Sequence, residues 1–568
     1  MIKKILIIRL SSLGDIILSS ATTVNYRINY PQSEICFLTK KQFQPLVKMF
    51  EAVDTIFTIP DKSDKKFLYN FLLELDKQNF DIVVDLHGNL RSWFSRKILS
   101  ASETVVYPKQ RLKRLQIVKQ KEFLDNQTHV IDLYNDTLLQ LDKKIYCRRP
   151  VIKTDNLFVK GFINLDKTKQ TVLIAPGAAH PTKKYPIDKF IEVGEKLKDQ
   201  YNIVWAVTEE DAGNIASANK LVNYPIQKLA SFIKKTDLSV TNDSGIAHLS
   251  SAVGTPNIAL FGPTHPALGF SPRGINDIVI EVDEYCRPCS RHGKKKCKRD
   301  QQYCFTKIEP QQIVDNATQL LSQKNRSSKA AFIDRDGTII VDKHFLSDPN
   351  EIEFISGSVD ALKKIKNLGY KLIIISNQSG VARGYFDVNT VEKINSKLLE
   401  MLLVQGVEID GLYYCPHYPN GNNREYSFLC DCRKPSPGMI ESAAKDLNLD
   451  IKNSIVIGDK ADDFFLGKVV GADSYLVLTG HGQKHKDKIP NSEKKFIYDN
   501  LFAVANRLSV VEKLLNSVIA SEAKQSKLLN LLMMNVIATS FTSGDLLAMT
   551  KFNKSLDGDQ PIGRVKSE

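Results

Sequence analysis

Short apolar runs rich in isoleucine and valine recur along the chain and alternate with longer helix-like segments. Strands buried on both faces of a parallel sheet read as continuous apolar runs of this kind. The alternation therefore predicts α/β domains built on parallel sheets. In the first 325 residues the expected strands form two sets, which are Ile5–Leu10, Ile35–Thr39, Thr55–Ile59 and Asp81–Leu86, then Val172–Ala175, Ile203–Val207, Leu238–Thr241, Ile258–Phe261 and Ile278–Val282.

The two sets predict two domains, over residues 1–160 and 161–325, with a hinge near residues 150–170 and a cleft between them. A polar stretch, Asn325-Arg-Ser-Ser-Lys329, follows and is typical of a linker between independent cores.

A third α/β domain is expected over residues 329–515. Residues 516–568 lack clean amphipathic spacing with caps, so we interpret them as a disordered, non-catalytic tail. The strands predicted for the third domain are Ala331–Ile333, Lys371–Ile375, Ser454–Ile457 and Tyr475–Leu478.

Bulk composition limits the class of protein. A chain of 568 residues is too long for one hydrophobic core. Arg9 interrupts the first apolar run after Ile5–Ile8, which favours a core strand over a signal peptide. No apolar run reaches the roughly 18 residues of a membrane span. Nine cysteines without a secretion signal indicate a reducing compartment and metal ligation rather than disulfides. We therefore expect a cytoplasmic protein.

The net charge of +14 can be explained in several ways. A solvated basic surface, an anionic membrane, a phosphorylated substrate and nucleic acid would each account for it.

Two aspartates, one residue apart, close the first strand of the third domain. They are Asp334 and Asp336, on a Gly-Thr turn. This pair suits covalent phosphoryl transfer, in which one carboxylate attacks phosphorus, the other moves a proton, and Mg²⁺ screens both. Asp459 closes another strand, as a carboxylate suited to Mg²⁺.

Phosphate-binding groups accompany these carboxylates. Ser376 and Asn377 end the second strand, where a hydroxyl, an amide and the following backbone N–H groups can hold a phosphate. Lys434 can neutralise the transferring phosphoryl group, and Arg433, which precedes it, is a further candidate for binding the phosphorylated substrate.

A cluster of three cysteines and one histidine lies between these motifs. Cys415 and His417 are two residues apart, as are Cys430 and Cys432. Three thiols and one imidazole form a complete tetrahedral zinc set with no open position, so the zinc would be structural. It would fix the loop that carries Arg433 and Lys434 beside the active site.

Together these motifs resemble the haloacid-dehalogenase (HAD) phosphatases over about residues 330–485. The resemblance implies that Asp334 is the nucleophile and Asp336 the general acid/base, and that Ser376 and Lys434 hold the phosphoryl group. It also implies that Mg²⁺ is bound by Asp334, the Asp336 backbone carbonyl and Asp459.

The zinc loop narrows this resemblance to two related phosphatases. One acts on D-glycero-D-manno-heptose 1,7-bisphosphate and the other on histidinol phosphate. The strings Cys415-Pro-His-Tyr-Pro-Asn-Gly421 and Cys430-Asp-Cys-Arg-Lys-Pro-Ser-Pro-Gly-Met439 look more like the heptose enzyme.

In the first domain, the opening strand runs into Ser11-Ser-Leu-Gly14-Asp15. The turn places the Asp15 carboxylate at a helix N-terminus, where aspartate also serves as an ordinary helix cap. In the second domain, Gly177 and Lys183 could take a diphosphate, and Asp243-Ser244-Gly245 through His248 form a further anion-binding turn.

These segments resemble the heptosyltransferases, glycosyltransferase family 9, over about residues 1–320. The resemblance implies a GT-B fold of two Rossmann-like domains and an inverting, metal-free reaction. Asp15 would be the base, Lys183 would contact the nucleotide diphosphate, and Asp243, Ser244, Gly245 and His248 would line the donor site. The donor would be ADP-heptose and the acceptor the lipid A–Kdo core, which implies peripheral contact with the cytoplasmic face of the inner membrane.

A second cysteine group surrounds a basic run. Zinc or another metal, free thiols and disulfides are all open for it, whereas sparse aromatic residues argue against nucleic acid. Its members are Cys286, Cys289, Cys297 and Cys304.

The sequence therefore predicts an α/β chain, a GT-B glycosyltransferase followed by a HAD-like phosphatase with a zinc loop. We expect a bifunctional enzyme of lipopolysaccharide heptose metabolism that uses ADP-heptose and heptose bisphosphate. The alternatives are a phosphatase for histidinol phosphate or another small phosphate ester, and a degenerate domain that serves only for binding.

Overall fold

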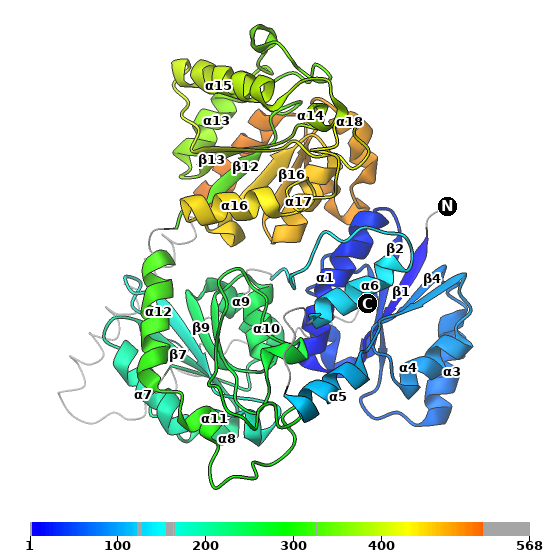
Figure 1. Cartoon of the computed structure of the whole chain (residues 1–568), viewed down its shortest axis with the longest axis vertical. Helices are drawn as coiled ribbons and strands as arrows, with labels where there is room; N and C mark the ends of the chain where they lie inside the picture. The colour runs from blue at the N-terminus through cyan, green and yellow to red at the C-terminus, as the bar shows by residue number, and fades with distance from the viewer. Residues whose placement is uncertain are drawn as a thin grey trace, which may run out of the picture. The chain divides into compact units, whose positions relative to one another are not determined.

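The computed structural model describes residues 3–121, 128–154, 163, 165–217, 219–324 and 327–514. Over these residues, three parallel sheets lie within the compact unit Met1–Ala505 (Figure 1). The predicted α/β class is confirmed. The predicted tail, Asn325 and Arg326 of the predicted linker, and most of residues 155–164 in the predicted hinge lie outside the described residues.

The first sheet has the order β3-β2-β1-β4-β5. Its central strand is the opening apolar run, in which Ile5 to Ile8 are fully buried, as a strand covered on both faces requires. The elements are β1 (Lys4–Ile8), α1 (Leu13–Asn29), β2 (Glu34–Lys40), α2 (Gln44–Val47), β3 (Thr55–Ile59), α3 (Lys65–Asp76), β4 (Ile82–Asp85), α4 (Leu90–Ile98), β5 (Glu103–Val106), α5 (Arg111–Gln120) and α6 (Val130–Leu139).

The second sheet has the order β11-β10-β9-β6-β7-β8. Its central strands β6 and β9 are buried along their whole length. The elements are β6 (Thr171–Ala175), α7 (Ile187–Leu197), β7 (Asn202–Val207), α8 (Glu209–Ala212), β8 (Lys220–Val222), α9 (Ile226–Lys235), β9 (Leu238–Asn242), α10 (Gly245–Ala252), β10 (Asn257–Leu260), β11 (Ile278–Ile280), α11 (Tyr303–Thr306) and α12 (Pro310–Lys324).

The third sheet has the order β14-β13-β12-β15-β16-β17. Strands β12 and β15 pair at its centre, which brings their carboxyl ends to one edge. The elements are β12 (Ala330–Ile333), α13 (Ser358–Asn367), β13 (Lys371–Asn377), α14 (Gly380–Arg383), α15 (Val388–Val404), β14 (Gly411–Cys415), α16 (Gly438–Leu447), β15 (Ile455–Gly458), α17 (Ala461–Val470), β16 (Asp473–Val477), α18 (Gly482–His485) and β17 (Ile497–Tyr498), with a final helix over residues 501–514.

All thirteen predicted strands occur, with ends that differ by up to two residues. Four observed strands were not predicted, and each lies at an edge of its sheet: β5, β8, β14 and β17. An edge strand is less fully covered and need not be a continuous apolar run. Strand β5, with the sequence Glu103-Thr-Val-Val106, has one buried residue in four.

Candidate active sites

Three buried carboxylates meet at the carboxyl edge of the third sheet. Asp334 follows β12, Asp459 follows β15, and Asp463 lies in the first turn of α17. One oxygen of each lies within 4.8 Å of the others. The Lys434 Nζ atom is 2.6 Å from Asp334 Oδ1 and 2.6 Å from Asp463 Oδ1. The structure therefore brings together Asp334, Asp459 and Lys434, as the sequence predicted, and adds Asp463.

The second aspartate of the motif faces a different set of groups. The Gln378 Nε2 atom donates to Asp336 Oδ2 at 2.9 Å, and the Ser376 hydroxyl donates to the same oxygen at 3.3 Å. The Arg335 guanidinium lies 3.0 Å from it. Asp336 is thus held apart from the three-carboxylate cluster, next to the serine predicted to bind phosphate.

The carboxylate cluster has the chemistry of a hard-cation site. Burial, and then the neighbouring Asp334 carboxylate, raise the pKa of Asp459 to about 8. Burial alone would lower the pKa of Lys434, but Asp334 and Asp463 raise it, so the lysine stays charged. Asp459 Oδ1 is buried without a hydrogen-bond partner among the described residues. Such an oxygen is suited to Mg²⁺, which would offset the repulsion among the carboxylates.

Two glycines let the backbone approach Asp459 closely. A Cβ atom on Gly337 or on Gly480 would lie 2.3 Å from Asp459 Oδ2, and both residues have positive φ, +84° and +52°. The next residue, His481, donates its backbone N–H to Asp459 Oδ2 at 2.7 Å. A side chain at either glycine would therefore collide with the cluster.

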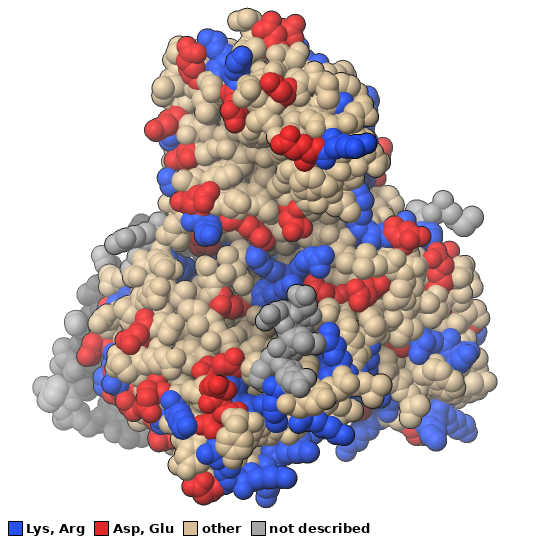
Figure 2. Space-filling view, in the orientation of Figure 1, with Lys and Arg blue, Asp and Glu red and all other residues tan. Residues whose placement is uncertain are grey.

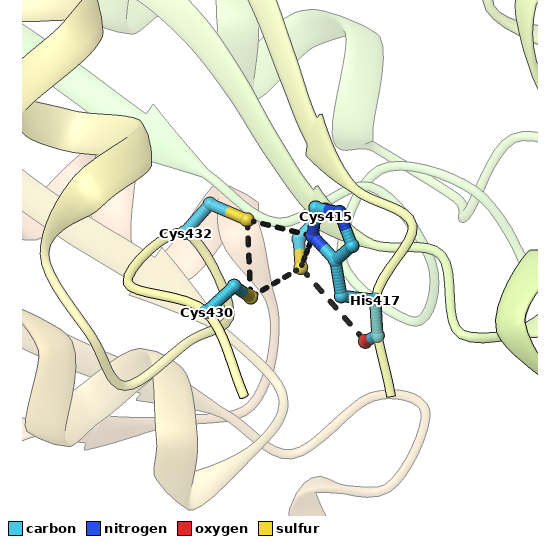
Figure 3. Close-up of side chains that lie close together, drawn as sticks. All are labelled: Cys415, His417, Cys430 and Cys432. Carbon is cyan, nitrogen blue, oxygen red and sulfur yellow. Dashed lines mark hydrogen bonds between the residues drawn. The ribbon is translucent and has the colours of Figure 1, made fainter. Parts of the chain in front are cut away.

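Cys415, His417, Cys430 and Cys432 converge as a four-ligand set (Figure 3). The Sγ atoms of Cys415 and Cys430 are 3.5 Å apart, and those of Cys430 and Cys432 are 3.2 Å apart. The His417 Nδ1 atom is 3.2 Å from Cys432 Sγ and 3.7 Å from Cys415 Sγ. Zn–S bonds of 2.3 Å in a tetrahedron imply ligand separations of about 3.8 Å. The side chains therefore fit a tetrahedral zinc ion.

Hydrogen bonds connect this cysteine loop to Lys434 and its neighbours. Arg433 donates to the backbone carbonyl of His417 at 3.2 Å. The Asn377 side-chain oxygen accepts the backbone N–H of Lys434 at 3.1 Å. In the structure, Asn377 and Arg433, which the sequence suggested as substrate-binding residues, thus bind the backbone of Lys434 and of His417.

The second candidate site lies where two helix N-termini meet. A Cβ atom on Gly14 of α1 would lie 2.7 Å from the ring of His248, and one on Gly245 of α10 would lie 2.5 Å from Leu13. Ser244 Oγ and His248 Nδ1 are buried without hydrogen-bond partners among the described residues. Facing helix N-termini with such free polar atoms favour binding of an anion.

Asp15 lies in the first turn of α1 and belongs to a capping box with Ser12. Its Oδ1 atom is 2.8 Å from an Arg9 guanidinium nitrogen and accepts the Tyr134 hydroxyl at 3.0 Å. Burial alone would raise the pKa of Asp15, but Arg9, Ser12 and Tyr134 together lower it to about 2. Asp15 is therefore ionised at neutral pH, and it also takes part in capping the N-terminus of α1.

Across the same site, Lys183 pairs with an acidic residue of the predicted donor turn. Its Nζ atom is 2.6 Å from Asp243 Oδ2, which also accepts the Thr264 hydroxyl at 2.6 Å. Burial is the main reason that the pKa of His248 falls to about 4. The nearby Asp243 carboxylate raises this pKa and the Lys183 ammonium lowers it. The structure thus gathers Asp15, Lys183, Asp243 and His248 as predicted.

Four residues of these sites escaped the sequence reasoning. Asp463 lies in the first turn of the helix that follows Asp459, and a carboxylate so soon after the strand end is the signal that could have revealed it. Arg9 was noticed only as a charge that interrupts an apolar strand. Tyr134 and Gln378 carried no sequence signal.

The other cysteine group does not form a comparable set. Cys286, Cys289, Cys297 and Cys304 are free thiols, and within the described part of the chain their sulfurs do not join any cluster of metal ligands.

Comparison with known proteins relates each half of the chain to a family. Residues 69–299 match glycosyltransferase family 9 (heptosyltransferase), and residues 431–504 match the HAD-hydrolase-like family. The chain is 44% identical over 155 residues to D-glycero-beta-D-manno-heptose-1,7-bisphosphate 7-phosphatase of Pasteurella multocida, which covers 27% of this chain and 83% of that protein. The chain belongs, through its C-terminal region, to this phosphatase family.

A second relative of the same family differs in its sugar anomer. The chain is 41% identical over 178 residues to D-glycero-alpha-D-manno-heptose-1,7-bisphosphate 7-phosphatase of Photorhabdus laumondii, which covers 31% of this chain and 94% of that protein. Among solved structures, the family 9 glycosyl transferase of Veillonella parvula matches with a TM-score of 0.47 and 22% identity, over 56% of this chain and 97% of that one. The family 9 match over residues 69–299 and the identity to the phosphatases together show that the chain joins a heptosyltransferase-like domain to a phosphatase domain.

Proposed function

We propose that the chain is a bifunctional enzyme of lipopolysaccharide inner-core heptose metabolism. The phosphatase part would remove the 7-phosphate of D-glycero-D-manno-heptose 1,7-bisphosphate. The glycosyltransferase part would transfer heptose from ADP-heptose to the lipid A–Kdo core. The identity of 44% over most of a heptose-bisphosphate phosphatase carries the first assignment. The family 9 match over residues 69–299 carries the second.

In the phosphatase site, Asp334 attacks phosphorus and forms an acyl-phosphate while the phosphate ester bond breaks. Asp336 gives a proton to the departing sugar oxygen and then takes one from the water that hydrolyses the acyl-phosphate. Lys434 and Ser376 hold the phosphoryl oxygens. Asp334, Asp459 and the Asp336 backbone carbonyl would bind Mg²⁺, with Asp463 beside them, and the ion would neutralise developing charge.

The zinc ion proposed for Cys415, His417, Cys430 and Cys432 would be structural. Its four protein ligands leave no open coordination position. It would keep Lys434 in place through Arg433, which bonds to the His417 carbonyl at 3.2 Å.

In the glycosyltransferase site, Asp15 accepts the proton of the acceptor hydroxyl. A carboxylate with a pKa of about 2 is a weak base, so the proton must move late, as the new C–O bond forms. Lys183 and the N-terminus of α10 stabilise the departing diphosphate, which makes a metal ion unnecessary for this step. Asp243, Ser244, Gly245 and His248 line the donor pocket.

A lipid-linked acceptor requires contact with a membrane surface, and α4 and α5 offer a suitable face. Leu112 is 77% exposed, Leu90 is 85% exposed and Trp93 is 49% exposed. Helix α5 has four basic and no acidic residues, and Figure 2 shows Lys and Arg side chains gathered around it. Exposed apolar residues among basic ones favour an anionic bilayer. No helix in the described residues is long and apolar enough to cross a membrane.

Two assays test these proposals. The full chain with Mg²⁺ should hydrolyse heptose 1,7-bisphosphate far faster than histidinol phosphate, and the reverse preference would overturn the substrate assignment. Sedimentation with vesicles should show binding to anionic but not to zwitterionic lipid. Leu112→Asp should weaken that binding, whereas Leu403→Asp, at a residue 63% exposed on α15, should not. Equal effects of both variants would contradict the proposed membrane face.

A further inference from the structure

A third cluster of metal-ligating side chains lies beside the phosphatase site and has no part in the chemistry above. Asp342, His344 and His481 place one oxygen and two ring nitrogens within 4.8 Å of one another. We propose that these three residues form a separate metal site that takes a transition ion such as Zn²⁺.

Asp342 contacts His344 through one of its carboxylate oxygens and His481 through the other. Its Oδ1 atom accepts the backbone N–H of His344 at 2.9 Å. Its Oδ2 atom lies 3.0 Å from the Nε2 atom of His481. The side chains of Asp342 and His481 are 15% and 26% exposed, so an ion from solution can reach them.

The backbone turn after Asp342 presents His344 to this site. His344 and Phe345 both have left-handed φ angles, +51° and +74°, which residues other than glycine rarely adopt. Phe345 anchors the turn by packing edge-on against Tyr385, with ring centroids 4.7 Å apart. The turn leaves the rings of His344 and His481 with their centroids 5.8 Å apart.

The donor set selects the class of ion. Two imidazoles and one carboxylate favour Zn²⁺, Co²⁺ or Ni²⁺ over Mg²⁺, which prefers oxygen ligands. Three protein ligands leave at least one coordination position for water or for an anionic oxygen. The set therefore differs from the Cys415 group, which is complete, and from the all-carboxylate group at Asp334.

Lys460 links this site to the phosphatase centre. Its Nζ atom lies 3.5 Å from Asp342 Oδ2 and 4.0 Å from Asp459 Oδ1. A metal ion bound at Asp342 competes with the Lys460 ammonium group for the Asp342 carboxylate. Lys460 would then pair with Asp459 alone. Occupation of the site should therefore change phosphatase turnover as well as zinc content.

Zinc content of the full chain tests the proposal. Protein saturated with Mg²⁺ is incubated with excess Zn²⁺, passed through a desalting column, and analysed for metal by mass spectrometry. Wild type should retain one more zinc ion per chain than the His344→Ala variant. His344 is exposed, so its replacement should not disturb the hydrophobic core. Lys343→Ala, a change at the adjacent residue, should match wild type. Because only the difference matters, zinc at the cysteines does not affect the result.

Cobalt gives a second readout that identifies the ligands. The Co²⁺ spectrum of wild type minus that of Asp342→Asn should contain d–d bands but no thiolate charge-transfer band, since oxygen and nitrogen are the only donors. Equal zinc content in wild type and His344→Ala would overturn the site. So would a difference spectrum without d–d bands.

Discussion

Lys434 is the residue whose loss should most disturb the phosphatase domain. It is 4% exposed and its Nζ atom lies 2.6 Å from both Asp334 and Asp463. Lys434→Met leaves two buried carboxylates without their cation, and removal of one partner of a buried ion pair costs about 3–5 kcal/mol. At ~2–4 °C per kcal/mol for a domain of this size, the melting temperature should fall by roughly 6–20 °C.

The pH dependence of this loss has a definite sign. Burial raises the pKa of Asp463 to about 6, even with Lys434 nearby. Without the lysine, which lowers the pKa of Asp463, this carboxylate becomes easier to protonate, and protonation removes its unpaired charge. The destabilisation should therefore be largest above pH 7 and smaller near pH 5. Added Mg²⁺ should restore part of the stability, because it replaces the missing positive charge.

Calorimetry of the full chain, combined with residual phosphatase activity after heating, identifies the affected transition. The matched control is Lys445→Met, at an exposed lysine of α16, which should leave that transition unchanged. A shift below about 2 °C at pH 8 without Mg²⁺ would refute the argument, since it would correspond to less than about 1 kcal/mol.

Three further predictions concern individual groups. Asp459→Asn should raise the Mg²⁺ concentration needed for half-maximal phosphatase activity by at least tenfold, and an unchanged requirement in a Mg²⁺ titration would count against the cation site. Cys430→Ser should lower the zinc content by one ion per chain and reduce phosphatase activity without altering glycosyl transfer, as measured by metal analysis and both assays. Because the pKa of Asp15 is about 2, the rate of glycosyl transfer should not fall between pH 7 and pH 5. Arg9→Met should raise the pKa of Asp15, so that the rate falls at a higher pH than in wild type. Identical pH–rate profiles for the two proteins would show that Asp15 does not accept the proton.

The sequence predicted the buried parts of this fold well and the edges poorly. Central strands such as β1 and β6 are covered on both faces, so their composition alone identifies them. Strands β5 and β17 lie at sheet edges, where side chains are only partly covered and the apolar signal is short. Tertiary pairing with a neighbouring strand, rather than local preference, makes these segments extended.

The same contrast applies to the sites. Asp334, Asp459 and the cysteine ligands occupy strand ends or close spacings that a single sequence reveals. The partners of Asp15 are different, because Arg9 reaches it from just beyond the end of β1, and Tyr134 reaches it from α6, at a sequence separation of 119 residues. The contact with Tyr134 depends on the tertiary fold and could not be read from the motif around Asp15.

The central claim is that one chain carries two independent chemistries, and two single substitutions test it most directly. Asp334→Asn and Asp15→Ala are each assayed, in the full chain, for heptose-bisphosphate hydrolysis and for transfer from ADP-heptose. Asp334→Asn should abolish hydrolysis and leave transfer unchanged, because an amide cannot form the acyl-phosphate. Asp15→Ala should abolish transfer and leave hydrolysis unchanged. Hydrolysis by Asp334→Asn, transfer by Asp15→Ala, or loss of both activities in either variant would contradict the account.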